Sequence, residues 1–244
     1  MRQKRLDEIL ISGGFAKDKK EAFILVTEGK VLVGGQKAVS PAQSVKKESE
    51  ILVRQEPRYV GRGAHKLEAA IKQFGIRVEG KVCADIGSAT GGFTEILLKH
   101  DAAKVYAIDT ARGKLALKLR ENPKVVALEG KDIRKLDMLP EKIDIVVIDV
   151  SLIPLENILP SVKKLATPAT KIITLFKPQY ETRDRSILKR GVIKDDQARE
   201  NLLKNFISWA KENSWEVKEW MESPIKGDKG NTEYLIYLAS NKSE

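Results

Sequence analysis

The sequence predicts an α/β protein made of a small N-terminal module and a larger domain with a doubly wound sheet. Its 244 residues exceed one typical domain and fall short of two. Residues 1 to about 57 combine two short helix patterns with a hairpin pattern, whereas strands and helices alternate from about Gly80 onward. Such alternation is typical of a mostly parallel sheet covered by helices on both faces.

The pattern of the N-terminal segment predicts two helices followed by a hairpin. Asp18 is placed to cap the second helix, which ends at Gly29, and Gly34-Gly35 forms the hairpin turn. The expected elements are a helix with Leu6, Ile9 and Leu10 on one face, a helix with Ala22, Leu25 and Val26, a hairpin over residues 30–39 and a strand over residues 51–53. We therefore expect a first domain over residues 1–57.

The charge balance favours a polyanionic partner. Lys and Arg outnumber Asp and Glu by 44 to 34, a formal charge of +10. The candidate RNA-binding residues are Arg5, Lys17, Lys19, Lys20 and Lys30 around the two helices, and Arg62 further on. By charge alone, a solvated basic surface explains these residues about as well as an RNA-binding face.

The N-terminal motifs R-L-D-x-x-L, G-x-A-x-x-x-x-E-A and G-x-V-x-V-x-G resemble those of the S4 RNA-binding domain. The resemblance covers nearly all of residues 1–57. It implies that the helices and the hairpin loop contact structured RNA, largely through phosphates, which position the RNA without reading its sequence.

The larger domain is expected over residues 64–244, after a linker at residues 58–63 and with a first helix near residues 66–74. The candidate strands are residues 82–86, 104–108, 125–128, 143–148, 171–176, 215–221 and 233–239, and the candidate helices are residues 94–99, 114–120, 155–165 and 196–212.

A glycine-rich turn after the first of these strands predicts a cofactor site. The turn leads into a helix, where the backbone approaches a ligand closely and free N–H groups are available. A dinucleotide site needs glycine at the position of Ala89, so a cofactor without pyrophosphate is favoured. The candidate cofactor residues are Asp85, Gly87, Gly91, Gly92, Phe93, Asp109 for the ribose hydroxyls and Asp132 for an adenine amino group.

The pattern D-x-G-x-x-x-G-G-F, followed by an acidic strand end, resembles the S-adenosylmethionine site of class I, Rossmann-like methyltransferases. A structural glycine turn in another α/β enzyme is the alternative. Two methyl acceptors fit poorly. Amine methylation uses Asn/Asp-Pro-Pro-aromatic where this chain has Asp149-Val150-Ser151-Leu152, and carbon-5 methylation needs a nucleophilic cysteine, whereas Cys83 lies in an apolar strand.

Four charged residues at strand ends and on the first helix are candidates for catalysis: Lys66, Asp149, Lys177 and Glu233. Strand carboxyl ends line the ligand crevice of such a sheet, so we expect Asp149 and Lys177 to face Gly87 and Gly91. For any one of the four, a structural ion-pair network is the better explanation, because single charges at strand ends are common. It explains all four together less easily.

Lys, Asp, Lys and Glu in this order resemble the catalytic tetrad of FtsJ/RrmJ-type ribose 2′-O-methyltransferases. The motifs G-R-G-A-x-K-L, D-V-S-L-I-P-L, F-K-P-Q-Y-E and G-N-T-E-Y-L, with the glycine loop and the S4 segment, look like the TlyA family, also called hemolysin A. The resemblance implies 2′-O-methylation of cytidine in 16S and 23S ribosomal RNA, with Lys177 as general base. The stretch after Asp109 departs from the family pattern, so no cofactor contact is carried over there.

The sequence also bears on membrane insertion, secretion and metal binding. No uncharged apolar run approaches the ~18 residues of a membrane span, and the charged start does not read as a signal peptide, so we expect a cytoplasmic protein. His65 and His100 lack neighbours at metal-ligand spacing, and no metal is expected. The alternatives are an S4 RNA-binding protein without transferase activity and a membrane-active hemolysin. The oligomeric state stays open.

Overall fold

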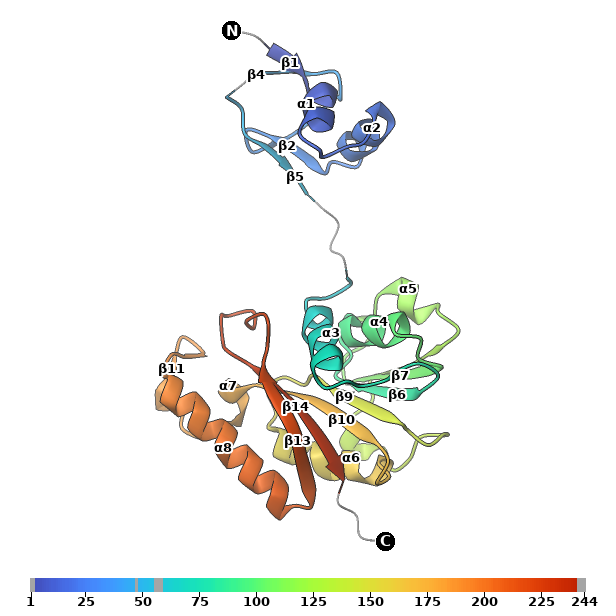
Figure 1. The fold of residues 1–244 in the computed structure, drawn as a ribbon, viewed down its shortest axis with the longest axis vertical. Coiled ribbons are helices and arrows are strands. Elements are labelled where there is room, and N and C mark those ends of the chain that lie inside the picture. The colour runs from blue at the N-terminus through green and yellow to red at the C-terminus, as the bar shows by residue number, and fades with distance from the viewer. Residues whose placement is uncertain (1–2, 47, 55–58, 241–244) are drawn as a thin grey trace. The chain divides into compact units, whose positions relative to one another are not determined.

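The computed structural model describes residues 3–46, 48–54 and 59–240. The chain divides into two compact units, Met1–Arg58 and Tyr59–Glu244 (Figure 1). The first unit is called the N-terminal unit below, and the second is called the catalytic unit.

The N-terminal unit holds two short helices against small sheets. Its elements are β1 (Gln3–Arg5), α1 (Leu6–Ser12), α2 (Lys19–Thr27), β2 (Val31–Val33), β3 (Gln36–Lys37), β4 (Ser44–Lys46) and β5 (Ile51–Val53). The side chain of Asp18 accepts a hydrogen bond from the Glu21 amide and caps α2 as predicted. Leu6, Leu10 and Ala22 are fully buried and form the core. The pairing of β1 with β4 was not predicted.

The expected linker at residues 58–63 is wrong for residues 59–63, which belong to the catalytic unit. Tyr59 is only 4% exposed and packs with the helix that follows it, and the Val60 amide donates to Glu95 at 2.7 Å. Burial of a large aromatic ring fixes this stretch, because apolar area is removed from water. Residue 58 lies outside the described residues.

The catalytic unit is built on a seven-stranded sheet in the order β13-β14-β10-β9-β6-β7-β8. The strands are β6 (Val82–Ile86), β7 (Lys104–Asp109), β8 (Val125–Glu129), β9 (Ile145–Ile148), β10 (Lys171–Phe176), β13 (Trp215–Glu222) and β14 (Tyr234–Ser240). All predicted strands are present, and β14 runs in the opposite direction to the other six. The predicted doubly wound α/β class is confirmed.

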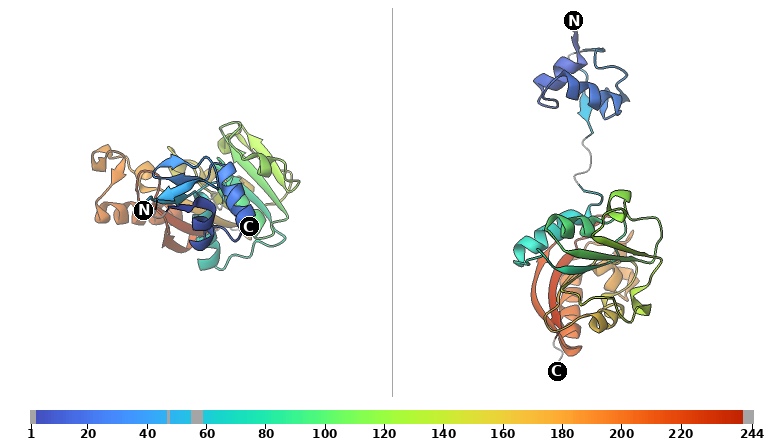
Figure 2. Two further views of the ribbon diagram at one scale, coloured as in Figure 1. Left: turned by 90° about the horizontal axis from the view of Figure 1, so that it is seen from above. Right: turned by 90° about the vertical axis from the view of Figure 1, so that its right-hand side faces the viewer.

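Helices cover both faces of this sheet (Figures 1 and 2). One face packs on α3 (Gly63–Gln73) and α4 (Gly92–Lys99), and the other packs on α6 (Leu159–Leu165) and α8 (Asp196–Glu212). The helix predicted over residues 155–165 is interrupted, because a 3₁₀ turn at Leu155–Asn157 precedes α6. Only Leu117–Arg120 (α5) of the helix predicted over residues 114–120 forms.

The strand order reverses direction between β6 and β9, and the crevice outside the carboxyl ends of these strands is the expected ligand site. Because β14 is antiparallel to β10, its first residues lie at the same edge, with Tyr234 opposite Phe176. This edge therefore collects Asp149, Lys177 and Glu233. The short α7 (Pro178–Glu181) and the hairpin of β11 (Leu188–Lys189) and β12 (Val192–Ile193) follow Lys177.

Candidate active site

The glycine loop between β6 and α4 packs directly against the end of β9. Gly87 has a φ of 83°, and a Cβ on it would stand 2.4 Å from the carbonyl oxygen of Asp149. Only glycine fits there without moving the backbone. The expected approach of Asp149 to Gly87 is therefore confirmed.

Gly91 packs beside two leucine side chains. It adopts a φ of 97° immediately before α4, and a Cβ on it would meet Leu119 at 2.3 Å and Leu115 at 2.9 Å. Leu115 and Leu119 thus fill the space that a side chain at residue 91 would need. The role of Gly91 at the cofactor site stays a prediction.

Asp85 lies beneath the loop and lines neither cavity described below. Its side chain is fully buried, and Thr94 donates a hydrogen bond to it at 2.6 Å. Burial raises the pKa of this carboxyl to about 7, while the bond from Thr94 opposes the shift. Asp85 supports the loop from inside the core, and the structure gives it no surface toward a cofactor.

Two adjoining cavities open at the carboxyl edge of the sheet. The larger one, of about 600 Å³, includes Lys66, Phe93 and Lys177 in its lining, and the smaller one, of about 270 Å³, includes Asp109 and Asp132. Their shared wall consists of Gly87, Ala89, Asp149 and Ser151. The glycine loop therefore separates a site near β7 from a site near β10.

In the smaller cavity, both predicted carboxylates already bind neighbouring groups. Asp109 accepts hydrogen bonds from the amides of Ala89 and Ala111, at 2.8 and 2.7 Å. Asp132 forms a two-pronged ion pair with Arg134, whose hydrogen bonds lower the pKa of the Asp132 carboxyl. An ionised carboxylate offers about four acceptor positions, so Asp109 keeps about two for a ligand, whereas Asp132, which accepts from three N–H donors of Arg134, keeps about one.

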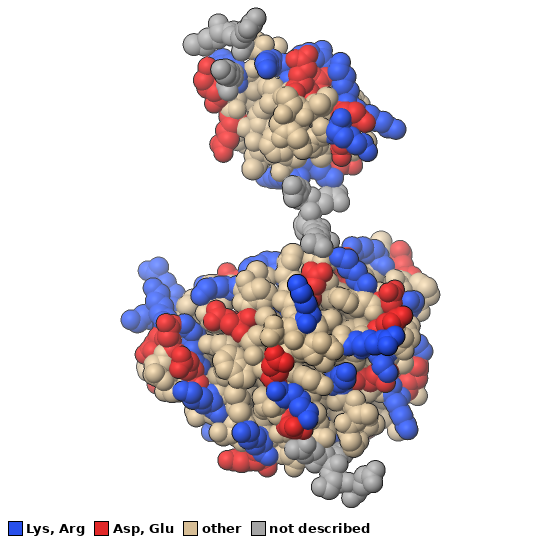
Figure 3. Space-filling model, in the orientation of Figure 1, with Lys and Arg blue, Asp and Glu red and all other residues tan. Residues whose placement is uncertain are grey.

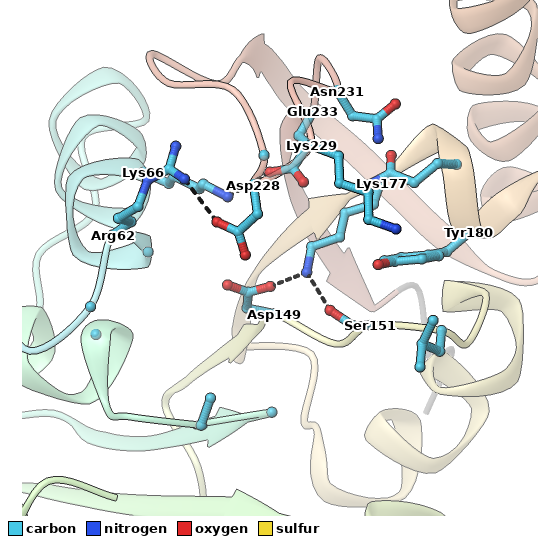
Figure 4. Close-up of a pocket in the computed structure, with 18 of the residues that line it drawn as sticks. Arg62, Lys66, Asp149, Ser151, Lys177, Tyr180, Asp228, Lys229, Asn231 and Glu233 are labelled. Atoms are coloured by element: carbon cyan, nitrogen blue, oxygen red, sulfur yellow. Dashed lines mark hydrogen bonds and ion pairs between the residues drawn. The ribbon is translucent and has the colours of Figure 1, made fainter. Parts of the chain in front are cut away.

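The four residues of the expected tetrad meet in the larger cavity as two ion pairs (Figure 4). The Nζ atom of Lys66 lies 2.5 Å from Oε2 of Glu233, and Nζ of Lys177 lies 2.5 Å from Oδ1 of Asp149. Lys66, Lys177 and Glu233 are each less than a tenth exposed. Buried charges require such pairing, because an isolated one is costly.

Further residues that the sequence did not single out complete the cavity. Ser151 accepts a hydrogen bond from Nζ of Lys177 at 3.0 Å, and the ring of Tyr180 lies 5.9 Å from the same atom. Both residues lie in motifs noted above, D-V-S-L-I-P-L and F-K-P-Q-Y-E. Membership of these motifs is the one sequence feature that could have pointed to them.

Arg62, expected to contact RNA, holds the loop before β14. It donates to Asp228 at 2.8 Å and to the carbonyl oxygen of Lys226 at 2.7 Å, and it also lines the larger cavity (Figure 4). Its guanidinium remains more than half exposed.

The other candidate RNA-binding residues lie in the N-terminal unit. Arg5 is paired with the buried carboxylate of Asp7, and Lys30 is paired with Glu28. Lys17, Lys19 and Lys20 are exposed. These three lysines, like Arg5, are therefore accessible to a partner.

The structure also bears on a metal site, a membrane-spanning helix and a cysteine nucleophile. Within residues 3–46, 48–54 and 59–240, no three His, Cys, Asp or Glu side chains gather as metal ligands. No helix in that part of the chain is long and apolar enough to cross a bilayer. Cys83 is buried, and burial raises the pKa of its thiol to about 12, which excludes it as a nucleophile at neutral pH.

Comparison with known proteins shows which family this chain belongs to. Residues 59–240 match the FtsJ-like methyltransferase family. The chain is 42% identical over 237 residues to hemolysin A of Brachyspira hyodysenteriae, covering 96% of this chain and 99% of the relative. It is 38% identical over 241 residues to the Mycobacterium tuberculosis protein named 16S/23S rRNA (cytidine-2′-O)-methyltransferase TlyA, covering 97% and 90% of the two chains.

A solved structure from Streptococcus thermophilus, provisionally described as a hemolysin, superposes on the whole chain and on 90% of its own, with a TM-score of 0.74 at 31% identity. A similarly described structure from Lactococcus lactis gives 0.73 at 37% identity over 78% of this chain and 92% of its own. The chain therefore belongs to the FtsJ-like methyltransferase family and, within it, to the group of hemolysin A and TlyA proteins.

Proposed function

We propose that this protein transfers a methyl group from S-adenosylmethionine to the 2′-hydroxyl of a cytidine in ribosomal RNA. The observation that carries the proposal is the convergence of two lysine–carboxylate pairs on a cavity that shares a wall with the glycine loop. The printed activity of the TlyA relatives supports the acceptor. Ribosomal RNA as substrate in turn supports a cytoplasmic location.

The residues around the glycine loop fit S-adenosylmethionine. Gly87 leaves no room for a side chain, so the loop backbone packs directly on Asp149 and forms the shared wall with it. Asp109 would hold the ribose hydroxyls and Asp132 the adenine amino group, through their remaining acceptor positions, while Gly92 and Phe93 line the neighbouring cavity. The cofactor supplies an electrophilic methyl group on a positively charged sulfur.

Within the tetrad, we assign Lys177 as the general base. As the 2′-oxygen attacks the methyl carbon, its proton has to be taken up; Nζ of Lys177 would accept it after passing its own proton to Asp149, its partner in the ion pair. Asp149 and Ser151 orient that nitrogen through the contacts described above. Lys66, held by Glu233, places a second amine on the same cavity and would fix the ribose in line.

The N-terminal unit would provide RNA affinity, chiefly through Lys17, Lys19 and Lys20, because these lysines are exposed. The resemblance of the N-terminal unit to an S4 domain also favours this role.

Methyl transfer from tritiated S-adenosylmethionine to 16S rRNA, 23S rRNA and intact ribosomal subunits tests the proposal. We expect label on at least one rRNA, released as a 2′-O-methylated dinucleotide after alkaline hydrolysis, since 2′-O-methylation blocks cleavage there. Label on a base, or binding of RNA without transfer, would contradict it. The second result would favour an RNA-binding protein without transferase activity.

A further inference from the structure

The catalytic unit carries a basic surface of its own beside the larger cavity. We call its members the hairpin cations: Arg183, Arg185, Lys189, Arg190 and Lys194 around β11 and β12, and Lys229 from the loop before β14. All six are exposed. Figure 3 shows projecting Lys and Arg side chains at the end of the catalytic unit where Figure 1 labels β11.

The acids next to these cations in the sequence are engaged with other groups: Asp195 accepts from the Ala198 amide, Asp196 pairs with Arg199, and Asp228 pairs with Arg62. Asp184 is the only carboxylate in residues 183–194, and it caps the turn by accepting the Ser186 amide. Arg183 reaches Glu156 only at 3.9 Å. Among the described residues, none of the other five hairpin cations has a carboxylate oxygen within 4.0 Å. The surface therefore keeps a positive charge available for a partner.

The hairpin is fixed relative to the tetrad by one buried amide. The side chain of Asn231, only 3% exposed, donates to the carbonyl oxygen of Gly191 at 2.9 Å and accepts from the Ile193 amide at 3.1 Å. Asn231 stands two residues before Glu233. The hairpin is thus attached to the segment directly before β14, and this segment carries Glu233 of the tetrad.

The turn of this hairpin contains an arginine where the backbone favours other residues. Arg190 and Gly191 have φ values of 53° and 81°, and two residues with positive φ form the type of turn in which Asn-Gly and Asp-Gly are preferred. An arginine there costs conformational free energy relative to asparagine. Folding of the turn alone therefore does not account for its presence.

We propose that the hairpin cations bind phosphates of the RNA strand that adjoins the target ribose. This deepens, and depends on, the proposed function. Arg185 and Lys229 line the same cavity as Lys66 and Lys177, so an anion bound there would belong to a chain that runs across the tetrad. A membrane surface fits less well, because Leu188, Val192 and Ile193 are at least partly buried and leave the hairpin without an exposed apolar anchor.

The test compares two triple variants of the full chain that each remove three positive charges. The first is Arg185→Gln, Lys189→Gln and Arg190→Asn. The control is Lys204→Gln, Lys211→Gln and Lys218→Gln on α8 and β13, outside the two cavities. Affinity for rRNA is measured between 50 and 300 mM KCl, along with cofactor affinity and single-turnover transfer.

For the hairpin variant, we expect rRNA affinity to fall roughly tenfold or more and the slope of log K against log salt to lose about two units, as three phosphate contacts predict. Cofactor affinity should not change in either variant. Arg190→Asn alone should weaken RNA binding without lowering Tm, which separates a binding role from a structural one.

Equal rRNA affinity and salt slope in the two triple variants would overturn the inference and leave the proposed function standing. If wild-type protein fails to methylate any rRNA, the proposed function fails, and this inference fails with it. Loss of binding to vesicles rich in anionic phospholipid, with rRNA binding intact, would also overturn the inference and identify a membrane partner.

Discussion

Gly227 lies so close to Glu233 that a Cβ on the glycine would stand 2.4 Å from Oε1 of the glutamate. The loop before β14 thus packs its backbone directly on the carboxylate that binds Lys66. A side chain at residue 227 and the Lys66–Glu233 pair compete for the same space.

Gly227→Ala should therefore displace Glu233 and lower methyl transfer by at least about tenfold, the scale of a mispositioned catalytic group. Cofactor affinity should stay near that of wild type. Gly230→Ala is the matched control. It meets no atom within 4 Å but has a φ of 89°, so it strains the loop without touching Glu233. Equal losses of single-turnover rate in both variants would show that loop strain, and not the contact, is responsible.

Lys177→Met keeps the approximate volume of the side chain and removes the proton acceptor. We expect folding and cofactor binding to survive and transfer to saturating rRNA to fall by about 10²- to 10⁴-fold. Lys177→Arg should be nearly as inactive, because a guanidinium stays protonated. An arginine variant with a near wild-type single-turnover rate would mean that positive charge suffices and that Lys177 is not the base.

Asp109→Ala should weaken cofactor binding by roughly 1.5–3 kcal/mol, the scale of a lost charge-assisted hydrogen bond. Part of this loss would come from the loop, because Asp109 also holds the Ala89 amide. Asp109→Asn keeps one acceptor and should be milder. Calorimetry that gives equal cofactor affinity for wild type and both variants would remove the ribose assignment, and rRNA affinity serves as the control for folding.

Glu181 should make stability depend on pH. It accepts a hydrogen bond from the Leu155 amide, but burial raises the pKa of its carboxyl to about 8. Above its ordinary value of 4.5, the unfolded chain releases this proton while the folded chain retains it, so stability falls with rising pH until about pH 8. The slope for one such proton is at most about 1.4 kcal/mol per pH unit.

Glu181→Gln keeps an acceptor for Leu155 and removes the titration. The Tm of this variant, measured beside wild type from pH 5 to 8, should gain on wild type as the pH rises. A constant difference in Tm across that range would contradict the assignment of a raised pKa to Glu181.

A chain that begins at Tyr59 should still bind S-adenosylmethionine, because that residue starts the catalytic unit and both cavities lie within it. We expect it to methylate rRNA poorly and to bind rRNA with a shallower salt dependence than the full chain. Unchanged rRNA affinity after this truncation would exclude an RNA-binding role for the N-terminal unit.

Local patterns were sufficient to predict most of the fold. The alternation of apolar strands and helices, the cap at Asp18 and the turn at Gly87 each depend on a few neighbouring residues, and the structure contains all of them. The tetrad residues were also predictable as a group, since strand carboxyl ends meet at one edge. Their partners were not, because Lys66 and Glu233 are 167 residues apart in the chain.

The contacts that were not predicted share a physical origin. Leu119 fills the space beside Gly91, Glu95 binds the amide of Val60, and β1 pairs with β4, and each of these contacts joins residues that lie far apart in the sequence. A glycine-rich motif gives the backbone conformation of a loop but not the direction in which each glycine faces. Asp85 was misplaced for the same reason, since its strand position does not reveal that Thr94 covers it.

The register that sets Tyr234 opposite Phe176 also determines which parts of this enzyme are free to diverge. Lys177 and Glu233 directly flank this cross-strand pair, so their separation is set by the hydrogen-bond ladder of β10 and β14 and not by the lengths of the intervening loops. Insertions within residues 183–190 would reshape the part of the larger cavity lined by Arg185 and Leu188 and leave the two charged groups at the same spacing. Changes in that loop could therefore alter which RNA segment is bound while the methyl-transfer chemistry is retained.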